Sequence, residues 1–226
     1  MGSQDRERQG AQSATAPAPG RRAEIVAAAG SLFRDHGYHA TSMRDLAKRL
    51  NLQGGSLYAH IGSKEELLWE IVDAAAEAFM TAADTVDPTL PAPERLRGLV
   101  RGHLGVVVDE LEHATVFFHE WTHLRPDLRQ RIVERRDAYQ DHFRRAVRDG
   151  VRDGSFAVDD ADLATLLVLS TLNWSYQWLD PGGRLDLDAL THAYATFLLR
   201  ALGAKQAVGP PEALASAPPN GEPIAH

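Results

Sequence analysis

The sequence predicts an all-α fold with a small three-helix N-terminal domain and a larger helical C-terminal domain. Seven of the 12 prolines lie in the first 20 or the last 22 residues. The other five separate long stretches whose apolar residues recur with helical spacing, and proline disfavours helix interiors. No segment alternates apolar and polar residues as a half-buried strand does. These observations favour helices throughout residues 21–204.

The composition is typical of a soluble globular chain, since 44% of the 226 residues are hydrophobic and 24% are charged. The uncharged stretch 163–179 is interrupted by polar side chains, so no membrane span is expected. Residues 1–20 lack the apolar core of a secretory signal, which predicts a cytoplasmic protein. The absence of cysteine excludes disulfides and thiolate metal sites. Both ends, 1–20 and 205–226, are predicted to be disordered tails.

Spacing and capping residues define the N-terminal helices. An apolar stripe from residue 21 predicts a helix that ends near Gly37. Ser42 and Asp45 form a capping box that opens a helix of about two turns, which Asn51 ends. After a turn at residues 53–55, a third short helix is predicted over residues 56–61.

A fourth helix begins at a second capping box, Ser63 with Glu66, and carries a long apolar stripe. We therefore expect an N-terminal domain over residues 21–66 and a C-terminal domain over residues 67–204. In the latter, apolar residues between 96 and 111 step by three and one, which indicates a helix. Further helices are predicted over residues 114–124, 127–152, 160–179 and 187–202.

Two short helices joined by a tight glycine-containing turn match the helix-turn-helix pattern. In that unit the first helix braces the second in the DNA major groove, where base edges are read. Leu46, Leu50 and Leu57 are candidates for its core, and Gly54 and Gly55 for the close approach of the helices. The alternative is a pair of helices in an ordinary bundle.

The distribution of charge favours DNA binding, although the net charge of -7 does not. Residues 1–64 hold nine basic and five acidic side chains, a net of +4, whereas residues 65–226 carry a net of -11. A mildly basic N-terminal part suits contact with phosphates. The alternative is a solvated charged face.

Many spaced positions between residues 25 and 67 together form a recognisable pattern. They are Ile25, Ala28, Ala29, Leu32, Phe33, Gly37, Tyr38, Thr41, Ser42, Met43, Leu46, Ala47, Gly55, Leu57, Tyr58, His60, Ser63, Lys64, Glu65, Glu66 and Leu67. This pattern resembles the N-terminal signature of the TetR family of transcriptional regulators. The resemblance implies a helix-turn-helix DNA-binding domain, followed by an effector-binding and dimerisation domain.

The resemblance also implies which residues contact DNA. Arg44 matches a position that often reaches a base, and its guanidinium suits guanine O6 and N7, with a phosphate contact as the alternative. Tyr58 and His60 are candidate backbone contacts that could instead serve packing. The full set of expected DNA-binding residues is Thr41, Arg44, Gly55, Ser56, Tyr58, His60 and Lys64. Departures at Gln53, Gly54 and Ile61 weaken any inference about the operator sequence.

A competing pattern, His119-Glu120-x-x-His123, places two imidazoles one turn apart if it lies on a helix, as in zinc hydrolases. Such an enzyme needs a third protein ligand, for which Glu134 and His142 are candidates. The extended protease pattern would require glycine and histidine where the chain has Pro126 and Arg129. We therefore expect no enzyme, no metal and no cofactor, and a metal-dependent hydrolase or metal sensor is the alternative.

Aromatic residues in the C-terminal domain are candidates for an apolar effector site, with ordinary core packing as the alternative. The expected ligand-binding residues are Phe118, Trp121, Tyr139, Asn173, Trp174 and Trp178. The stretch from Phe117 to Pro181 also loosely resembles TetR-like regulators that respond to acyl-CoA thioesters. Nearby arginines could bind the phosphates of coenzyme A or form a solvated face: Arg125, Arg129, Arg135, Arg136 and Arg144. A hydrophobic drug is the alternative effector.

The resulting hypothesis is a homodimeric repressor of a palindromic DNA operator. The segments 163–179 and 187–202 would form a four-helix dimer interface, as the family resemblance implies. Effector binding would move the two reading heads apart through the helix that begins at Ser63, which requires different affinities for the two states.

Overall fold

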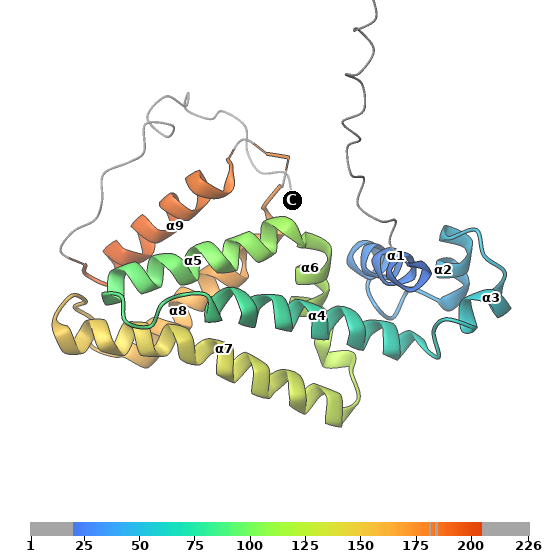
Figure 1. The fold of residues 1–226 in the computed structure, drawn as a ribbon, viewed down its shortest axis with the longest axis horizontal. Coiled ribbons are helices and arrows are strands. Elements are labelled where there is room, and N and C mark those ends of the chain that lie inside the picture. Colours follow the sequence, from blue (N-terminus) through green and yellow to red (C-terminus); the bar gives the residue numbers. More distant parts are fainter. Residues whose placement is uncertain (1–19, 181, 184, 205–226) are drawn as a thin grey trace, which may run out of the picture.

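The computed structural model describes residues 20–180, 182–183 and 185–204, and every regular element in these residues is helical. The expected tails, 1–20 and 205–226, lie outside the described residues except for Gly20. The molecule is elongated, with the three N-terminal helices at one end and a bundle of the remaining helices forming the rest (Figure 1). The all-α prediction is confirmed for the described part of the chain.

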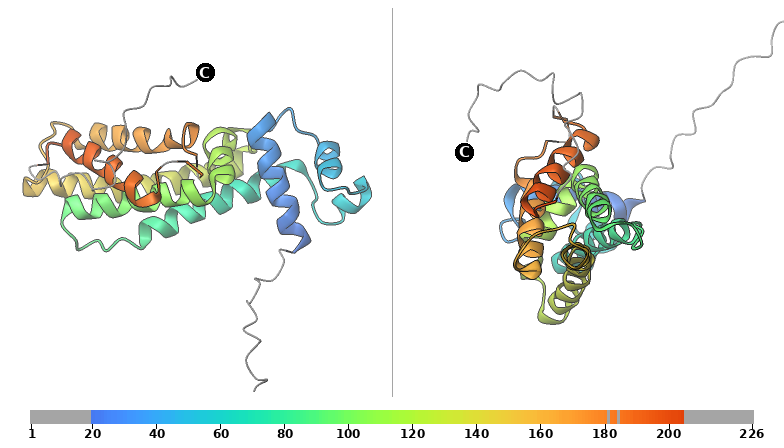
Figure 2. Two further views of the ribbon diagram at one scale, coloured as in Figure 1. Left: turned by 90° about the horizontal axis from the view of Figure 1, so that it is seen from above. Right: turned by 90° about the vertical axis from the view of Figure 1, so that its left-hand side faces the viewer.

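The three-helix unit consists of α1 (Arg21–His36), α2 (Met43–Arg49) and α3 (Gly54–Tyr58). Helix α4 (Lys64–Asp84) leaves this unit and runs into the bundle, as Figure 2 shows from above. The bundle continues with α5 (Ala92–Asp109), α6 (Leu111–His119), α7 (Pro126–Asp153), α8 (Ala161–Asn173) and α9 (Leu187–Ala201).

The turn between α2 and α3 differs from the predicted glycine turn at residues 53–55. Helix α3 begins at Gly54, and the left-handed residue of the turn is Asn51, with φ of 53°. The amide of Leu52 donates to the carbonyl of Ala47 at 2.8 Å, and that of Asn51 donates to Lys48 at 3.2 Å. This pair of bonds is the Schellman motif that ends many helices, and asparagine tolerates the left-handed conformation that it needs.

The two predicted capping boxes differ in the structure. At α2, Ser42 and Asp45 bond reciprocally, as predicted. At α4, the Ser63 hydroxyl accepts from the Glu66 amide at 3.0 Å, but the Glu66 carboxylate accepts from the amide of Gly62 instead of Ser63. Both helices therefore begin with a capped amide. The Glu66 carboxylate bonds to the amide of Gly62, one residue before the amide that the predicted capping box would use.

Two predicted helices of the C-terminal domain end early. The segment 114–124 is not one helix, because α6 runs from Leu111 to His119 and a 3₁₀ turn, η1 (Trp121–His123), follows it. The chain must redirect there, since Pro126 starts α7 and restricts the residue before it. The segment 160–179 likewise divides into α8 and the 3₁₀ turn η2 (Ser175–Gln177), a tightening common at helix ends.

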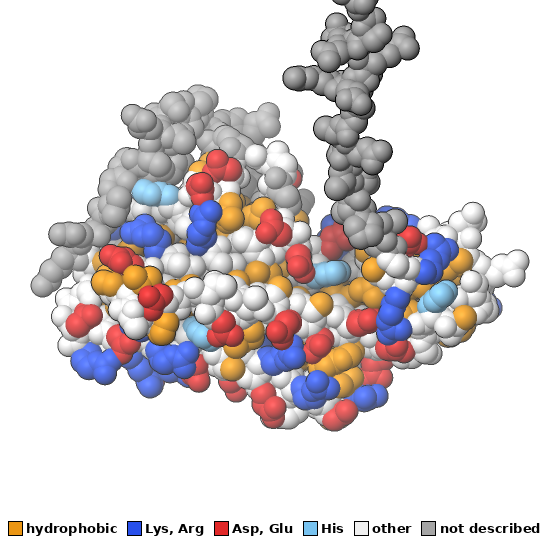
Figure 3. Space-filling model, viewed as in Figure 1, with side chains coloured by type: hydrophobic (Ala, Val, Ile, Leu, Met, Phe, Trp, Pro, Cys, Tyr) orange, Lys and Arg blue, Asp and Glu red, His pale blue; other side chains and the backbone are white. Residues whose placement is uncertain are grey.

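The surface of the described part is that of a charged protein. Acidic and basic side chains are interspersed over the face seen in Figure 3, with apolar side chains between them. None of the described helices is both long and apolar enough to span a membrane.

Candidate DNA-binding surface and effector cavity

Helix α3 lies at one end of the molecule, and four of the predicted DNA-binding residues lie on it or directly after it. Leu57 is completely buried and anchors the helix, whereas Gly55, Ser56, Tyr58 and His60 are exposed. The Tyr58 side chain is 56% exposed, so it does not serve as a core aromatic. The structure thus brings these four positions together on one solvent-facing surface.

The glycines of α3 are not required by the packing of the protein. A Cβ built at Gly54 or Gly55 would meet no atom within 4 Å, and neither residue has a positive φ. The prediction that they allow a close approach of the two helices is therefore wrong. Glycine weakens a helix by roughly 0.5–1 kcal/mol relative to alanine, and the described fold does not account for that cost at α3.

Three cations beside α3 are available to an external anion. In the three-helix unit, Arg22 is paired with Glu66 and Glu70, and Arg34 with Asp35 and Glu112. By contrast, three exposed cations of α2 form no ion pair with any other described residue: Arg44, Lys48 and Arg49. Unpaired surface cations next to an exposed short helix can bind phosphates.

Thr41 and Lys64 are located differently from the other predicted contacts. Thr41 is buried, and its hydroxyl donates to the carbonyl of Gly37 at 2.9 Å. The Lys64 ammonium donates to the carbonyls of Tyr38 and Thr41 at 2.5 and 2.7 Å and lies 4.1 Å from the centre of the Tyr38 ring. Burial lowers the pKa of Lys64. In this structure both residues join the loop after α1 to the start of α4.

A cavity of about 190 Å³ lies within the bundle, between α4, α5, α6, α7 and α8. Of the predicted ligand-binding residues, Phe118, Tyr139 and Asn173 line it. Trp121, Trp174 and Trp178 do not. Trp174 and Trp178 are exposed, and Trp178 stacks on Tyr194.

Sequence reasoning missed much of the cavity wall. Phe79 and His103 fall within the regular apolar stripes of α4 and α5, where they resemble ordinary core residues. Nδ1 of His103 lies 2.9 Å from the Tyr139 hydroxyl oxygen, and burial lowers the pKa of His103 to about 3. The candidate arginines Arg135 and Arg136 also line the cavity, together with Ala76, Phe79, His103, Phe117, Gln140, Leu166, Leu169 and Ser170.

The arginines proposed for coenzyme A have separate environments. Arg125 pairs with Asp127, Arg135 with Asp73 and Glu77, and Arg144 with Asp141 and Asp162. Arg129 is exposed. The fifth, Arg136, lines the cavity and lies over the rings of Phe117 and Trp121, at 5.4 and 5.0 Å from their centres. Only this arginine combines a place at the cavity with no ion pair among the described residues.

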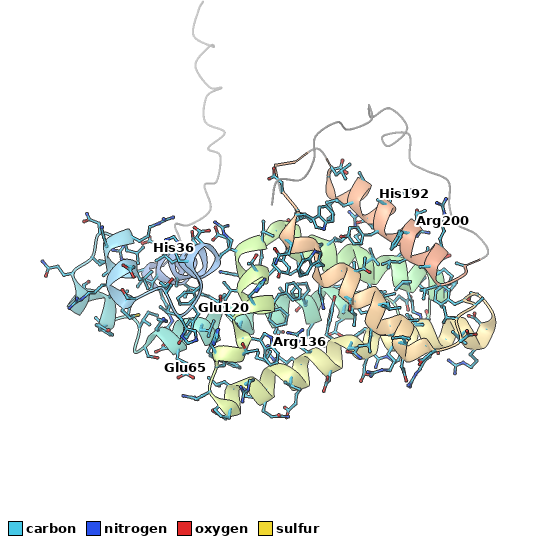
Figure 4. The ribbon with its side chains drawn as sticks, turned by 180° about the vertical axis from the view of Figure 1, so that it is seen from behind. His36, Glu65, Glu120, Arg136, His192 and Arg200 are labelled. Atoms are coloured by element: carbon cyan, nitrogen blue, oxygen red, sulfur yellow. The ribbon has the colours of Figure 1, made fainter. Side chains whose placement is uncertain are left out.

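The segment that follows α6 joins the cavity to the three-helix unit. Nδ1 of His123 lies 2.9 Å from Nε2 of His39, and its ring stacks on Tyr38 at 5.7 Å. The amide of Arg125 donates to the Glu65 carboxylate at 2.9 Å. Figure 4 shows Glu65 and Glu120 where the three-helix unit meets the bundle, and Arg136 farther into the bundle. A displacement of α6 would therefore reach the loop before α2.

The His119-Glu120-x-x-His123 pattern does not form the arrangement of a zinc hydrolase. It spans the end of α6 and η1, so the two histidines are not one turn apart on a single helix. His119 contacts Tyr176 and Gln177, whereas His123 contacts His39. The candidate third ligand His142 faces Asp84. No group of three or more His, Asp or Glu side chains among the described residues could hold a metal ion.

An exposed apolar surface covers α8 and part of α9. Leu163, Leu166 and Leu167 recur at helical spacing and are each about half exposed or more, and Phe197 of α9 is 62% exposed. The opposite side of α8, with Val168 and Leu172, is buried. Exposed apolar stripes of this size are typical of protein interfaces.

Comparison with known proteins identifies the family. The chain matches the family model of bacterial regulatory proteins of the tetR family over residues 25–71, and a Tetracyclin repressor-like C-terminal domain over residues 89–202. It is 31% identical to the transcriptional repressor KstR2 of Mycolicibacterium smegmatis over 188 residues, which cover 79% of this chain and 89% of the relative.

Solved structures agree in fold. The ketosteroid transcriptional regulator KstR2 of Mycobacterium tuberculosis aligns with a TM-score of 0.73 at 26% identity, covering 83% of this chain and 96% of that chain. AibR in complex with isovaleryl coenzyme A and operator DNA aligns with a TM-score of 0.71 at 26% identity, covering 80% and 98%. The chain belongs to the TetR family of transcriptional regulators, whose members bind DNA through an N-terminal helix-turn-helix.

Proposed function

We propose that the chain is a homodimeric repressor that binds a palindromic operator through residues 21–66 and is released by a small effector bound within residues 67–204. A regulator of this family is expected to act in the cytoplasm, as a binding protein and not as an enzyme. The alternative of a metal-dependent hydrolase has no supporting cluster among the described residues.

The observation that supports DNA binding most strongly is the surface at the end of the three-helix unit. Helix α3 exposes Ser56 and Tyr58, whose hydroxyls can donate to phosphate oxygens, and its glycines have open space beside them. The unpaired cations of α2 lie on the adjacent helix. A short helix with small residues at its start can approach a DNA groove closely, and the neighbouring cations would then fix its register.

Two features support an effector in the bundle. The cavity has aromatic walls and a small number of polar groups, which is typical of sites for small ligands. Its wall includes α6, which continues into η1 and the contact of His123 with His39. An acyl-CoA thioester is the effector class that we favour, because the related AibR structure holds isovaleryl coenzyme A. A hydrophobic drug is the alternative.

The exposed stripe of α8 supports a dimer. The leucines at 163, 166 and 167 lie on one side of a helix whose other side is buried, and Phe197 extends the apolar surface to α9. Two copies related by a twofold axis would bury these residues against each other. A twofold dimer places two copies of α3 on symmetric half-sites about one helical turn of DNA, or a multiple of it, apart.

The test is binding to DNA that flanks the protein's own gene, followed by fluorescence anisotropy between 50 and 200 mM salt. Wild-type protein should bind tightly at low salt and lose affinity as salt rises. The R44Q/K48Q double variant should lower the salt slope by about 0.9 for each lost phosphate contact. R145Q, which changes an exposed arginine on α7, is the matched control. Absence of binding at low salt would contradict the proposal.

A further inference from the structure

The size of the cavity limits what can enter it. Its volume is about 190 Å³, and an apolar protein cavity of about 150 Å³ admits a benzene molecule. Phe79, Phe117 and Leu169, which form part of its wall, are each buried, so these side chains have little freedom to move aside. On this scale the cavity holds one ring or a short branched chain. A fused four-ring skeleton exceeds this volume, so it would have to extend past the half-exposed Leu166 or displace the helices.

One end of the cavity has an uncharged polar pair. His103 is 1% exposed, and its Nδ1 lies 2.9 Å from the Tyr139 hydroxyl oxygen. Its Nε2 has no hydrogen-bond partner among the residues that the structure describes. Burial lowers the pKa of His103 and raises that of Tyr139, so both groups are neutral near pH 7. A neutral pair of this kind can bond an uncharged hydroxyl or carbonyl group but cannot compensate an ionic charge.

The partly buried Arg136 borders the same space and has no ion pair among the described residues. Its Nη1 is buried without a hydrogen-bond partner in the described part of the chain, and its guanidinium lies over the rings of Phe117 and Trp121. Burial lowers the pKa of Arg136. A buried N–H donor of a cation is costly to leave unpaired, and an oxygen atom with negative charge would relieve that cost. The charge of the neighbouring Arg135 is already compensated by Asp73 and Glu77, so Arg135 gains less from binding an anionic oxygen.

We propose that this cavity selects a compact acyl group of about six to ten heavy atoms, whose carbonyl or carboxylate oxygen binds Arg136 and whose far end meets the His103–Tyr139 pair. The inference rests on the proposed function, since it names the class of effector for the same site. A steroid-sized acyl group is larger than the volume of this cavity, so the proposal predicts that the chain does not respond to one.

Isothermal titration of the purified protein with a panel of acyl groups tests the size limit. The probes are benzoyl-CoA, isovaleryl-CoA, the steroid thioester cholyl-CoA, free coenzyme A, and the acids benzoate and isovalerate. We expect at least one compact acyl group to bind at least tenfold more tightly than cholyl-CoA or free coenzyme A. Comparing the affinity for each thioester with that for its free acid shows whether Arg136 binds a thioester carbonyl or a carboxylate. Tighter binding of cholyl-CoA, or no binding by any compact probe, would overturn the proposal.

The R136Q variant tests the role of the cation. It should weaken binding of the best compact probe at least tenfold, whereas R145Q, which changes an exposed arginine on the same helix, should not. The thermal midpoint of R136Q should equal or exceed that of the wild type, because the variant removes a partly buried charge that has no ion pair among the described residues. A lower midpoint with unchanged ligand affinity would show a purely structural arginine and overturn the assignment.

The Y139F variant tests the polar pair. Wild-type protein should prefer 4-hydroxybenzoyl-CoA over benzoyl-CoA, and Y139F should lose that preference while still binding benzoyl-CoA. Y194F, which removes a hydroxyl outside the cavity, is the control. If Y139F prefers 4-hydroxybenzoyl-CoA as strongly as the wild type does, the far end of the acyl group does not meet the His103–Tyr139 pair. Operator binding without ligand, measured in parallel, separates failure of this inference from failure of the proposed function.

Discussion

Nε2 of His39 lies 2.9 Å from Nδ1 of His123, and this contact joins the loop before α2 to the turn that follows α6. His123 also stacks on Tyr38 and lies 3.3 Å from the Glu120 carboxylate. Helix α6 supplies Phe117 and Phe118 to the cavity wall. The two histidines therefore provide a packed connection between the cavity wall and the three-helix unit, in addition to the covalent connection through α4, which supplies Ala76 and Phe79 to the same wall.

Removal of this contact should uncouple the two sites. In H123A, the effector should still bind, but its effect on operator affinity should shrink from the 5–150-fold that is typical of allosteric coupling toward about 1-fold. The measurement is operator affinity with and without saturating effector. H36A, an exposed histidine at the end of α1, should retain full coupling. Full coupling in H123A would show that the signal takes another route.

The G55A substitution should raise the stability of the protein and lower its affinity for the operator. Because a Cβ there meets nothing within 4 Å, G55A should stabilise the protein by about 0.5–1 kcal/mol in urea unfolding. It should also weaken operator binding if the helix backbone approaches DNA. The control G105A, on α5, places a methyl group in ordinary contact with Leu187 of α9 and should leave operator binding unchanged. Unaltered DNA affinity in G55A would contradict the docking of α3.

The apolar stripe of α8 should be an interface in solution. The Leu167 side chain is 60% exposed in the isolated chain, so L167E should cause no loss within the monomer core but should place a charge in the proposed dimer interface. Sedimentation should show a dimer for the wild type and a monomer for L167E. L90E, at an exposed leucine far from α8 in the sequence, should stay dimeric. A dimeric L167E would contradict this interface.

His103 should make the protein less stable in mild acid. Its pKa is about 3 in the fold and about 6.5 in an unfolded chain, so the unfolded state binds an extra proton between these values. Stability attributed to this group is complete above pH 6.5 and falls as pH decreases, by about 2 kcal/mol at pH 5. Urea unfolding at pH 7, 6 and 5 measures the loss.

A variant isolates the contribution of His103 from that of other titrating groups. H103Q should lose stability less steeply between pH 7 and 5 than the wild type. If that variant does not fold, the ring proton signals of His103 in the wild type give the same information. Titration of those signals near pH 6.5 would contradict a buried neutral imidazole.

The helical fold could be predicted because apolar periodicity is a local property. The stripes of α1, α4 and α5, and the capping box at Ser42, all follow from neighbouring residues. The ends of α6 and α8 could not be predicted, because 119–123 and 173–177 continue the helical spacing while the chain must turn toward the next packed helix. The end of α2 at Asn51 was predicted correctly, whereas the start of α3 was placed after residues 53–55 because glycine is more common in turns than inside helices.

The cavity could be predicted only in part because it is made by five helices that diverge. Phe118 and Tyr139 could be predicted because they are aromatic side chains on two neighbouring predicted helices. Trp174 and Trp178 are aromatic as well, but both are exposed and lie outside the cavity. His103 and Phe79 have no local sign of function, since each occupies a regular core position. Arg136 was one of several arginines on α7, and only the packing around it distinguishes it from its paired neighbours.

The measurement that tests the whole account most directly is release of the operator by the effector. Wild-type protein is bound at low salt to a labelled DNA fragment from beside its own gene, and an acyl-CoA thioester that binds the protein in titration is then added. The account predicts that fluorescence anisotropy falls to the value of free DNA as the effector saturates, and that free coenzyme A has no effect. Tight binding of both DNA and thioester without release would contradict it.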